Sequence, residues 1–237
     1  MASTKSRKLG DSIVRTDGWN NFNIWDHSQT VLDLYTRRAR DEEVEMTCAA
    51  QAAELLSGVL SPGESVIDAG CGSGYFFHSL RKRGMNVSYR GFDASERLIA
   101  IGKAELPEFG LDPERLTVLR IEDFQGAADH MLCMNVLSNI DNYHRPLERL
   151  LLAARKTLVL RESISENASY AYVRDDHLDP GIDLKVHVNT YARGDILTFI
   201  SGYGFTVEEV VDRRTGGAPE MVIGHPHCWT FLVATRT

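Results

Sequence analysis

The stretch from Val66 to Phe76, with sequence VIDAGCGSGYF, constrains the fold of this chain more than any other segment. Val66 and Ile67 have the apolar character of the end of a buried parallel strand. Three glycines then fall at every second position, which lets the backbone turn sharply and approach a ligand without interference from a Cβ atom. Aromatic residues after the turn restart an apolar pattern that indicates a helix. A strand, a glycine-rich turn and a helix predict a nucleoside-sized site at the carboxyl edge of an open α/β sheet.

Strands and helices alternate through the segments around this turn. The pattern predicts strands at 65–68, 87–93, 116–121, 130–137 and 157–160, and helices at 75–83, 95–104, 147–154 and 193–202. Strand–helix units of this size imply a parallel sheet with helices on both faces. Apolar alternation predicts two closing strands, at 205–211 and 228–234. Two further helices are predicted between Ser28 and Val59, and we expect the first of them to lie across the site.

The length of 237 residues suits one large domain, and we predict a single domain over residues 1–237. Residues 1–20 carry no periodic pattern and are expected to form a mobile arm. Residues 21–60 are expected to form a helical cap. The segment 164–191 is long and polar and contains several tyrosines, and we expect it to be a lid over the substrate because long loops in compact domains are usually functional or mobile.

Composition excludes several classes of function. The formal net charge is −7, which argues against a nucleic-acid partner, since such proteins normally present a basic face. No apolar run approaches the roughly 18 residues of a membrane span, and the N-terminal residues lack the apolar core of a signal peptide. We therefore expect a cytoplasmic protein with no membrane partner. The four cysteines are scattered without a CxxC pair, so we expect reduced thiols and neither disulfides nor a zinc site.

Polar residues follow several of the predicted strands at the same edge of the sheet. Asp93 ends the second strand, where one carboxylate can accept hydrogen bonds from both hydroxyls of a ribose. Glu122, Asp123 and Phe124 end the third strand, where an acid can accept from an adenine amino group and an aromatic ring can pack on the base. Asn135 lies at the end of the fourth strand, near the middle of the expected cleft.

From about Ser28 to its C-terminus, the chain resembles class I S-adenosylmethionine-dependent methyltransferases, in particular those that act on small molecules. The segment from Asp68 to Gly74 is similar to the first motif of that family, and the segment 187–205 is similar to the corresponding part of its small-molecule members. The resemblance implies a Rossmann-like α/β fold with a seven-stranded sheet, in which the last strand is antiparallel and lies between the fifth and sixth. The cofactor-binding residues that it implies are Tyr35, Asp68, Gly70, Cys71, Gly72, Gly74, Asp93, Ala94, Glu122, Asp123, Phe124 and Asn135.

The resemblance also implies an activity, which is transfer of a methyl group from S-adenosylmethionine to an oxygen or nitrogen of a small molecule, with S-adenosylhomocysteine as product. An oxygen nucleophile needs a base, and an imidazole has a suitable pKa. We name His187 and His144 as candidate catalytic residues. Many relatives carry a histidine just after the fourth strand, where this chain has Asn139. If the acceptor is a neutral amine, no strong base is required.

Two other functions share part of this pattern. A nicotinamide-dependent oxidoreductase would need the fingerprint GxGxxG/A, but Tyr75 stands at the position of the last small residue. A catalytically silent subunit that binds the cofactor and supports a partner is the second alternative. The polar segment 164–191 argues against it, because such a segment suits a ligand.

Two motifs raise the question of a metal. The sequence HPHC at 225–228 contains zinc-ligand types, and DDH at 175–177 contains ligands for a divalent ion. We favour a turn and strand for the first and a solvated loop for the second. We therefore predict no metal.

Overall fold

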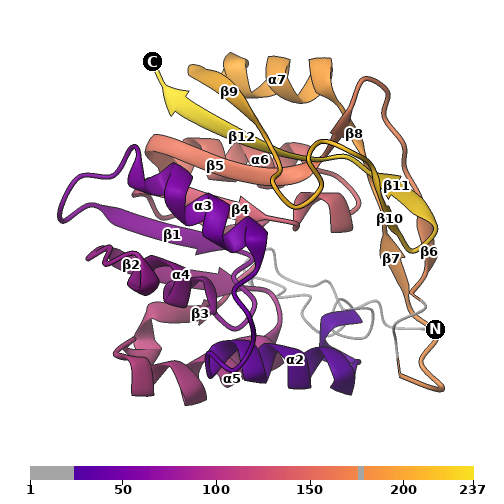
Figure 1. The fold of residues 1–237 in the computed structure, drawn as a ribbon. Helices are drawn as coiled ribbons and strands as arrows, with labels where there is room; N and C mark the ends of the chain where they lie inside the picture. Colours follow the sequence, from indigo (N-terminus) through magenta and orange to yellow (C-terminus); the bar gives the residue numbers. More distant parts are fainter. Residues whose placement is uncertain (1–23, 176–178) are drawn as a thin grey trace, which may run out of the picture.

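An eight-stranded sheet organises residues 24–175 and 179–237, the part of the chain that the computed structural model describes (Figure 1). Seven strands form its main path, and the eighth, β8 (Tyr191–Ala192), pairs with the end of β5. In spatial order the seven are β3 (Leu116–Val118), β2 (Ser88–Asp93), β1 (Ser65–Ala69), β4 (Ala128–Met134), β5 (Ala154–Ser165), β12 (Trp229–Arg236) and β9 (Phe205–Val211).

The strand directions confirm the expected Rossmann-like architecture. The pairs β2–β3, β1–β2, β1–β4 and β4–β5 are all parallel. Strand β12 is antiparallel to both of its neighbours, β5 and β9. The last strand therefore lies inside the sheet, between the fifth and sixth strands of the pattern, as the resemblance implied.

Helices cover both faces of the sheet, and the alternation of side chains along the strands explains why. In β5, Leu158 and Leu160 join one apolar cluster, whereas Val159 joins the other. The Val159 cluster lies under α3 (Thr47–Ser57), α4 (Phe76–Lys82) and α5 (Glu96–Glu105). The Leu158 cluster lies under α6 (His144–Ala153) and α7 (Arg193–Gly202). Because both faces are buried, the middle of β5 is apolar on both sides, as Leu158, Val159 and Leu160 show.

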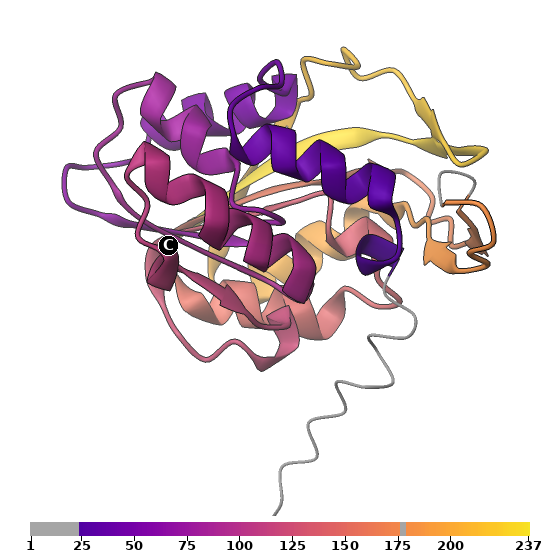
Figure 2. The ribbon, with the colours of Figure 1, turned by 90° about the horizontal axis from the view of Figure 1, so that it is seen from below.

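The helix α2 (Gln29–Ala39) packs beside α5 below the carboxyl ends of the first strands (Figure 2). Ser28 caps α2, since its hydroxyl accepts a hydrogen bond from the Val31 amide at 3.2 Å. Ser95 caps α5 by accepting a hydrogen bond from the Leu98 amide at 3.1 Å. Both caps begin helices that border the site described below.

The C-terminal ends of three parallel strands differ from the prediction by three residues or more. Strand β3 ends at Val118, because residues 121–123 form a 3₁₀ turn in place of the predicted strand residues. Strand β4 ends at Met134, since Asn135 adopts a left-handed conformation with φ of 58° that breaks the extended backbone. Strand β5 runs to Ser165, well beyond the predicted end at 160, because β12 pairs with it as far as Ser163.

The predicted lid is also more regular than expected. Within 164–191, β6 (Tyr172–Arg174) pairs with β7 (Lys185–His187) in a small antiparallel sheet. Val186 of β7 and Val188, just after it, are buried and cluster with Ile24, which stabilises this segment. A second hairpin joins β10 (Glu220–Val222) to β11 (His225–His227), between the two closing strands, where no hairpin was predicted.

The predicted N-terminal arm, 1–20, lies outside the described residues. No helix within 24–175 and 179–237 is long and apolar enough to cross a membrane.

Candidate functional site

A cavity opens at the carboxyl ends of β1, β2, β3 and β4, where α2 crosses the sheet edge. Seven of the twelve residues predicted to bind a cofactor line it: Tyr35, Gly70, Gly72, Asp93, Ala94, Glu122 and Asn135. They come from α2 and from the ends of four strands, so the fold brings together residues that are as much as 100 positions apart. This position at the sheet edge is the one predicted from the glycine-rich turn.

The glycines of the turn are required by close contacts as well as by backbone conformation. Gly70 has φ of 75°, and a Cβ atom there would lie 2.3 Å from Cγ2 of Val136. Gly72 has φ of 57°, and a Cβ atom there would lie 2.4 Å from the Tyr35 ring. The absence of side chains thus lets β4 and α2 pack directly against the turn, which forms the floor of the cavity between them.

Asp93 joins the end of β2 to the glycine turn. One of its carboxylate oxygens accepts from the Gly72 amide and the other from the Ser95 amide, both at 2.8 Å. Burial raises the pKa of the Asp93 carboxyl, and these hydrogen bonds oppose the rise. Each oxygen keeps a lone pair, and the half-buried carboxylate lines the cavity, so it can accept hydrogen bonds from a ligand diol.

The helix α2 brings a cation to the cavity. The guanidinium of Arg38 lies 5.1 Å from the centre of the Tyr35 ring and 5.3 Å from that of Tyr75, and all three residues line the cavity. Burial raises the pKa of Tyr35 to about 12, although the Arg38 charge opposes this. The other two arginines near the end of α2 pair with acids, Arg37 with Glu43 at 2.6 Å and Arg40 with Glu105 at 2.8 Å. Arg38 is therefore the cation that α2 offers to a ligand.

The turn after β4, residues 135–140, forms the opposite wall of the cavity; we call it the β4 turn. It is held by Glu162 of β5, which is fully buried. The Glu162 carboxylate accepts from the amides of Val136, Leu137 and Ser138 at 3.1, 3.0 and 2.8 Å, and from the Ser138 hydroxyl at 2.8 Å. Burial raises the pKa of Glu162, and these donors oppose the rise. Their number makes the β4 turn a rigid wall.

Asp68 does not line the cavity. It lies beneath the glycine turn, 3% exposed, where its carboxyl accepts from the Tyr89 hydroxyl at 2.9 Å. Burial raises its pKa to about 7, against the lowering effect of the Tyr89 hydrogen bond.

The other predicted residues that do not line the cavity have different partners. The Cys71 thiol is buried and packs against Gly91. A Cβ atom on residue 91 would lie only 2.7 Å from the Cys71 sulfur. Gly74 packs against Leu116. Asp123 is exposed, and the Phe124 ring stacks on Phe92 at 4.7 Å.

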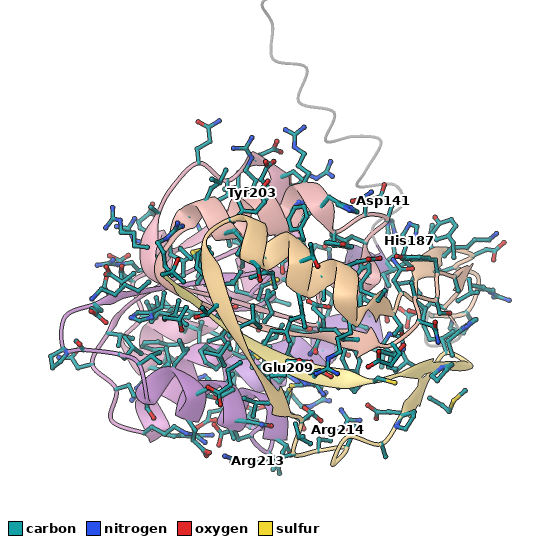
Figure 3. The ribbon with its side chains drawn as sticks, turned by 90° about the horizontal axis from the view of Figure 1, so that it is seen from above. Asp141, His187, Tyr203, Glu209, Arg213 and Arg214 are labelled. Carbon is teal, nitrogen blue, oxygen red and sulfur yellow. The ribbon has the colours of Figure 1, made fainter. Side chains whose placement is uncertain are left out.

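Neither candidate catalytic histidine lines the cavity. His187 is half-buried on β7, and its ring stacks on Tyr172 at 4.5 Å between centroids. Figure 3 shows it at the same end of the molecule as Asp141. His144 is exposed at the start of α6, where its ring stacks on Tyr143 at 4.2 Å and its Nδ1 lies 2.8 Å from the Asn142 amide oxygen. Both imidazoles thus have structural contacts of their own.

The cavity also contains residues that the sequence did not single out. Leu119, Arg120 and Ile121 line it because β3 ends three residues earlier than predicted, which brings them to the sheet edge. Tyr75 lines it too, although it was interpreted as the start of a helix and as a departure from the dinucleotide fingerprint, and not as a lining residue. Among the described residues, no three histidine, cysteine or acidic side chains are close enough to hold a metal ion. The last two residues of the DDH motif, 176 and 177, lie outside them.

Comparison with known proteins gives a consistent result. Residues 38–210 match a family described as "Methyltransferase domain". A search of curated proteins found none with significant sequence similarity.

Solved structures that resemble the chain share its fold. One is magnesium protoporphyrin IX methyltransferase from Synechocystis PCC 6803 with bound SAH, which is 18% identical with a TM-score of 0.63 over 93% of this chain and 100% of that one. Another is an amino pentose methyltransferase from Micromonospora echinaspora with bound SAM, which is 17% identical with a TM-score of 0.57 over 88% and 97%. A third is 1,6-didemethyltoxoflavin-N1-methyltransferase from Burkholderia thailandensis, which is 17% identical with a TM-score of 0.56 over 81% and 79%. At these identities the likeness establishes the fold.

Proposed function

The chain belongs to the family of methyltransferase domains, and on that premise we propose that it transfers a methyl group from S-adenosylmethionine to an oxygen or nitrogen of a small molecule. The three structural neighbours named above are methyltransferases of a porphyrin, an amino pentose and a toxoflavin precursor, which supports a small-molecule acceptor.

The observation that carries this proposal is the order of chemical groups along the sheet edge. Glu122 and Asp93 follow the neighbouring strands β3 and β2. An adenosine bound here would have Glu122 as the acceptor for its amino group and Asp93 as the acceptor for its ribose hydroxyls. The glycine turn follows β1, and Arg38 of α2 supplies a cation suited to a carboxylate. This set fits a nucleoside joined to an amino acid.

Bound S-adenosylmethionine would supply an activated methyl carbon, so the chain's own task is to align the reactants and exclude water. Asp93 and Glu122 would hold the nucleoside, and Arg38 the methionine carboxylate. The β4 turn would form the wall beside the methyl group, because β4 lies across β1 from the nucleoside strands.

The segment 164–191 supports a role in acceptor binding. It reaches the β4 turn directly, since the Asn189 side chain donates to the Ile140 carbonyl at 2.7 Å and the Tyr191 hydroxyl donates to the Leu137 carbonyl. We infer that this segment covers the acceptor side of the cavity.

The candidate bases His187 and His144 can be tested directly. Because the described contacts of both rings lie away from the cavity, we expect His187→Ala and His144→Ala each to keep turnover within about threefold of the wild type once an acceptor is known. A loss of about a hundredfold or more, together with a changed pH–rate profile, would identify the replaced histidine as the base.

Calorimetry with S-adenosylhomocysteine tests the proposed cofactor site. We expect the wild-type protein to bind it and Asp93→Ala to bind about tenfold or more weakly, because two hydroxyl donors lose a charged acceptor. Asp112→Ala, at an exposed acid away from the cavity, is the matched control and should bind like the wild type. Unchanged affinity in Asp93→Ala would reject the ribose assignment, and no binding by the wild type would reject the proposed function.

A further inference from the structure

The strand β5 contains two consecutive charged residues, Arg161 and Glu162, that are both buried. Side chains alternate along a strand, so Arg161 points to the α3 side of the sheet and Glu162 to the α6 side. Arg161 is 2% exposed, and Glu162 is fully buried. Buried charges are costly and contribute little net stability when paired, so their position beside the cavity calls for another explanation.

Arg161 is held in place from two directions. Its Nε donates to Asp212 at 2.7 Å, and its guanidinium lies 4.4 Å from the centre of the Trp229 ring. The Asp212 side chain is fully buried; burial opposes ionisation, but the Arg161 guanidinium keeps the pKa of the Asp212 carboxyl below its usual value. The pair is therefore ionised and fixed.

Arg161 also contacts the first residue of the β4 turn twice. Its Nη1 donates to Oδ1 of Asn135, and its backbone carbonyl accepts from the Asn135 amide at 2.8 Å. A guanidinium has only donors, so the side-chain atom that faces it must be the oxygen of Asn135. The amide nitrogen of that side chain is thereby turned the other way.

The remaining polar groups of Asn135 are consistent with this orientation. Its backbone carbonyl accepts from the Asn139 side chain at 2.7 Å. Its side-chain nitrogen has no hydrogen-bond partner among residues 24–175 and 179–237, it is not sealed from solvent, and Asn135 lines the cavity. The conformation with φ of 58° is one that asparagine tolerates better than most residues. Asn135 is thus a donor directed at the cavity.

From these contacts we propose that Arg161 and Asp212 are positioning residues, which turn the side-chain amide of Asn135 so that it donates to the amino-acid end of the methyl donor. The inference rests on the proposed function. Asn135 follows β4, and β4 lies on the opposite side of β1 from β2, which carries the proposed ribose acceptor Asp93. An amide donor at this place meets the amino-acid end of the ligand and not the nucleoside.

Two ligands of different length separate positioning from general stability. S-Adenosylhomocysteine has the amino-acid end, and 5′-methylthioadenosine lacks it. We expect Arg161→Met to lower the affinity for S-adenosylhomocysteine about tenfold, as for the loss of one hydrogen bond to a charged group, and to change that for 5′-methylthioadenosine less than about twofold. Calorimetry on the full chain measures both.

Asn135→Gly is the second variant, because glycine keeps the left-handed backbone without strain and removes the side-chain donor together with the oxygen that Arg161 contacts. It should show the same selective loss, and it carries the test if Arg161→Met does not fold. Arg236→Met is the matched control. Arg236 donates to the Leu151 and Ala154 carbonyls at the other end of β5 and packs on Phe205, so its loss should lower stability without changing either affinity.

Equal weakening of both ligands in Arg161→Met and Asn135→Gly would overturn the inference, as would unchanged affinity for both. These results leave the proposed function intact, because the wild type still binds S-adenosylhomocysteine. A wild-type protein that binds neither ligand would instead overturn the proposed function, and this inference with it.

Discussion

Replacing Asp68 by asparagine should stabilise the protein at neutral and alkaline pH. The Asp68 carboxyl is 3% exposed and has one hydrogen-bond donor, the Tyr89 hydroxyl. One donor does not compensate for the removal of a carboxylate from water, and burial therefore raises its pKa from 3.8 to about 7. An asparagine has nearly the same shape, can accept from Tyr89 through its oxygen, and never ionises.

The sign and size of the effect follow from that shift. Below about pH 4 the Asp68 carboxyl is protonated in both the folded and the unfolded chain, so its ionisation does not affect the free energy of unfolding. Between about pH 4 and about pH 7 the unfolded chain loses this proton while the folded protein keeps it, so the free energy of unfolding falls as the pH rises. A difference of about 3 pKa units corresponds to about 4 kcal/mol.

Urea unfolding of the wild type and Asp68→Asn, at about pH 4 and about pH 8 and at one ionic strength, measures this difference. The two proteins should be similarly stable at the lower pH, and the variant more stable by up to about 4 kcal/mol at the higher pH. Other titrating groups are common to both proteins and cancel in the comparison. A stability difference that does not change with pH would refute the reasoning, because it would mean that Asp68 ionises in the folded protein as it does in water.

Two other perturbations address the cavity. Gly70→Ala should lower the free energy of unfolding, measured by chemical denaturation, by about 3 kcal/mol. The new residue would have a positive φ, and its Cβ atom would lie only 2.3 Å from the Val136 side chain. A loss below about 0.5 kcal/mol would show that the β4 turn can move to make room for the Cβ atom. Arg38→Met should weaken S-adenosylhomocysteine binding about tenfold in calorimetry, whereas Arg40→Met, at the arginine that faces away from the cavity, should not; equal effects would reject the assignment of Arg38.

Local patterns were sufficient to predict the sheet and the position of the cavity. A strand that ends in an acid has to place that acid at the sheet edge, and the Asp93 carboxylate does line the cavity. Asp68 follows the same local rule, but its side chain turns to the buried Tyr89 beneath the turn. A strand end predicts which edge a residue reaches and does not predict which way its side chain faces.

The roles of residues whose environment depends on distant segments could not be predicted from the sequence. Arg161 and Glu162 lie in a strand where charges are unexpected. Arg161 pairs with Asp212 and Asn135 and Glu162 with the β4 turn, all of them far away in the sequence. The sequence did not single out this pair of charges for a role, because only the packed sheet brings β4, β5 and the end of β9 together. His187 was predicted from its place in the lid, but its ring contacts Tyr172, which a hairpin absent from the prediction brings opposite it.

The sheet has one long edge, β9, and its sequence bears on how the protein behaves at high concentration. An exposed edge strand can pair with the edge of another molecule and begin aggregation. Glu208 and Glu209 place two charges in the middle of this edge, where Figure 3 labels Glu209. Arg193 of α7 pairs with Glu209 at 2.6 Å. Docking a second strand here would bury these charges, and at the opposite edge β3 offers only three residues. The sheet is therefore protected against growth at both ends.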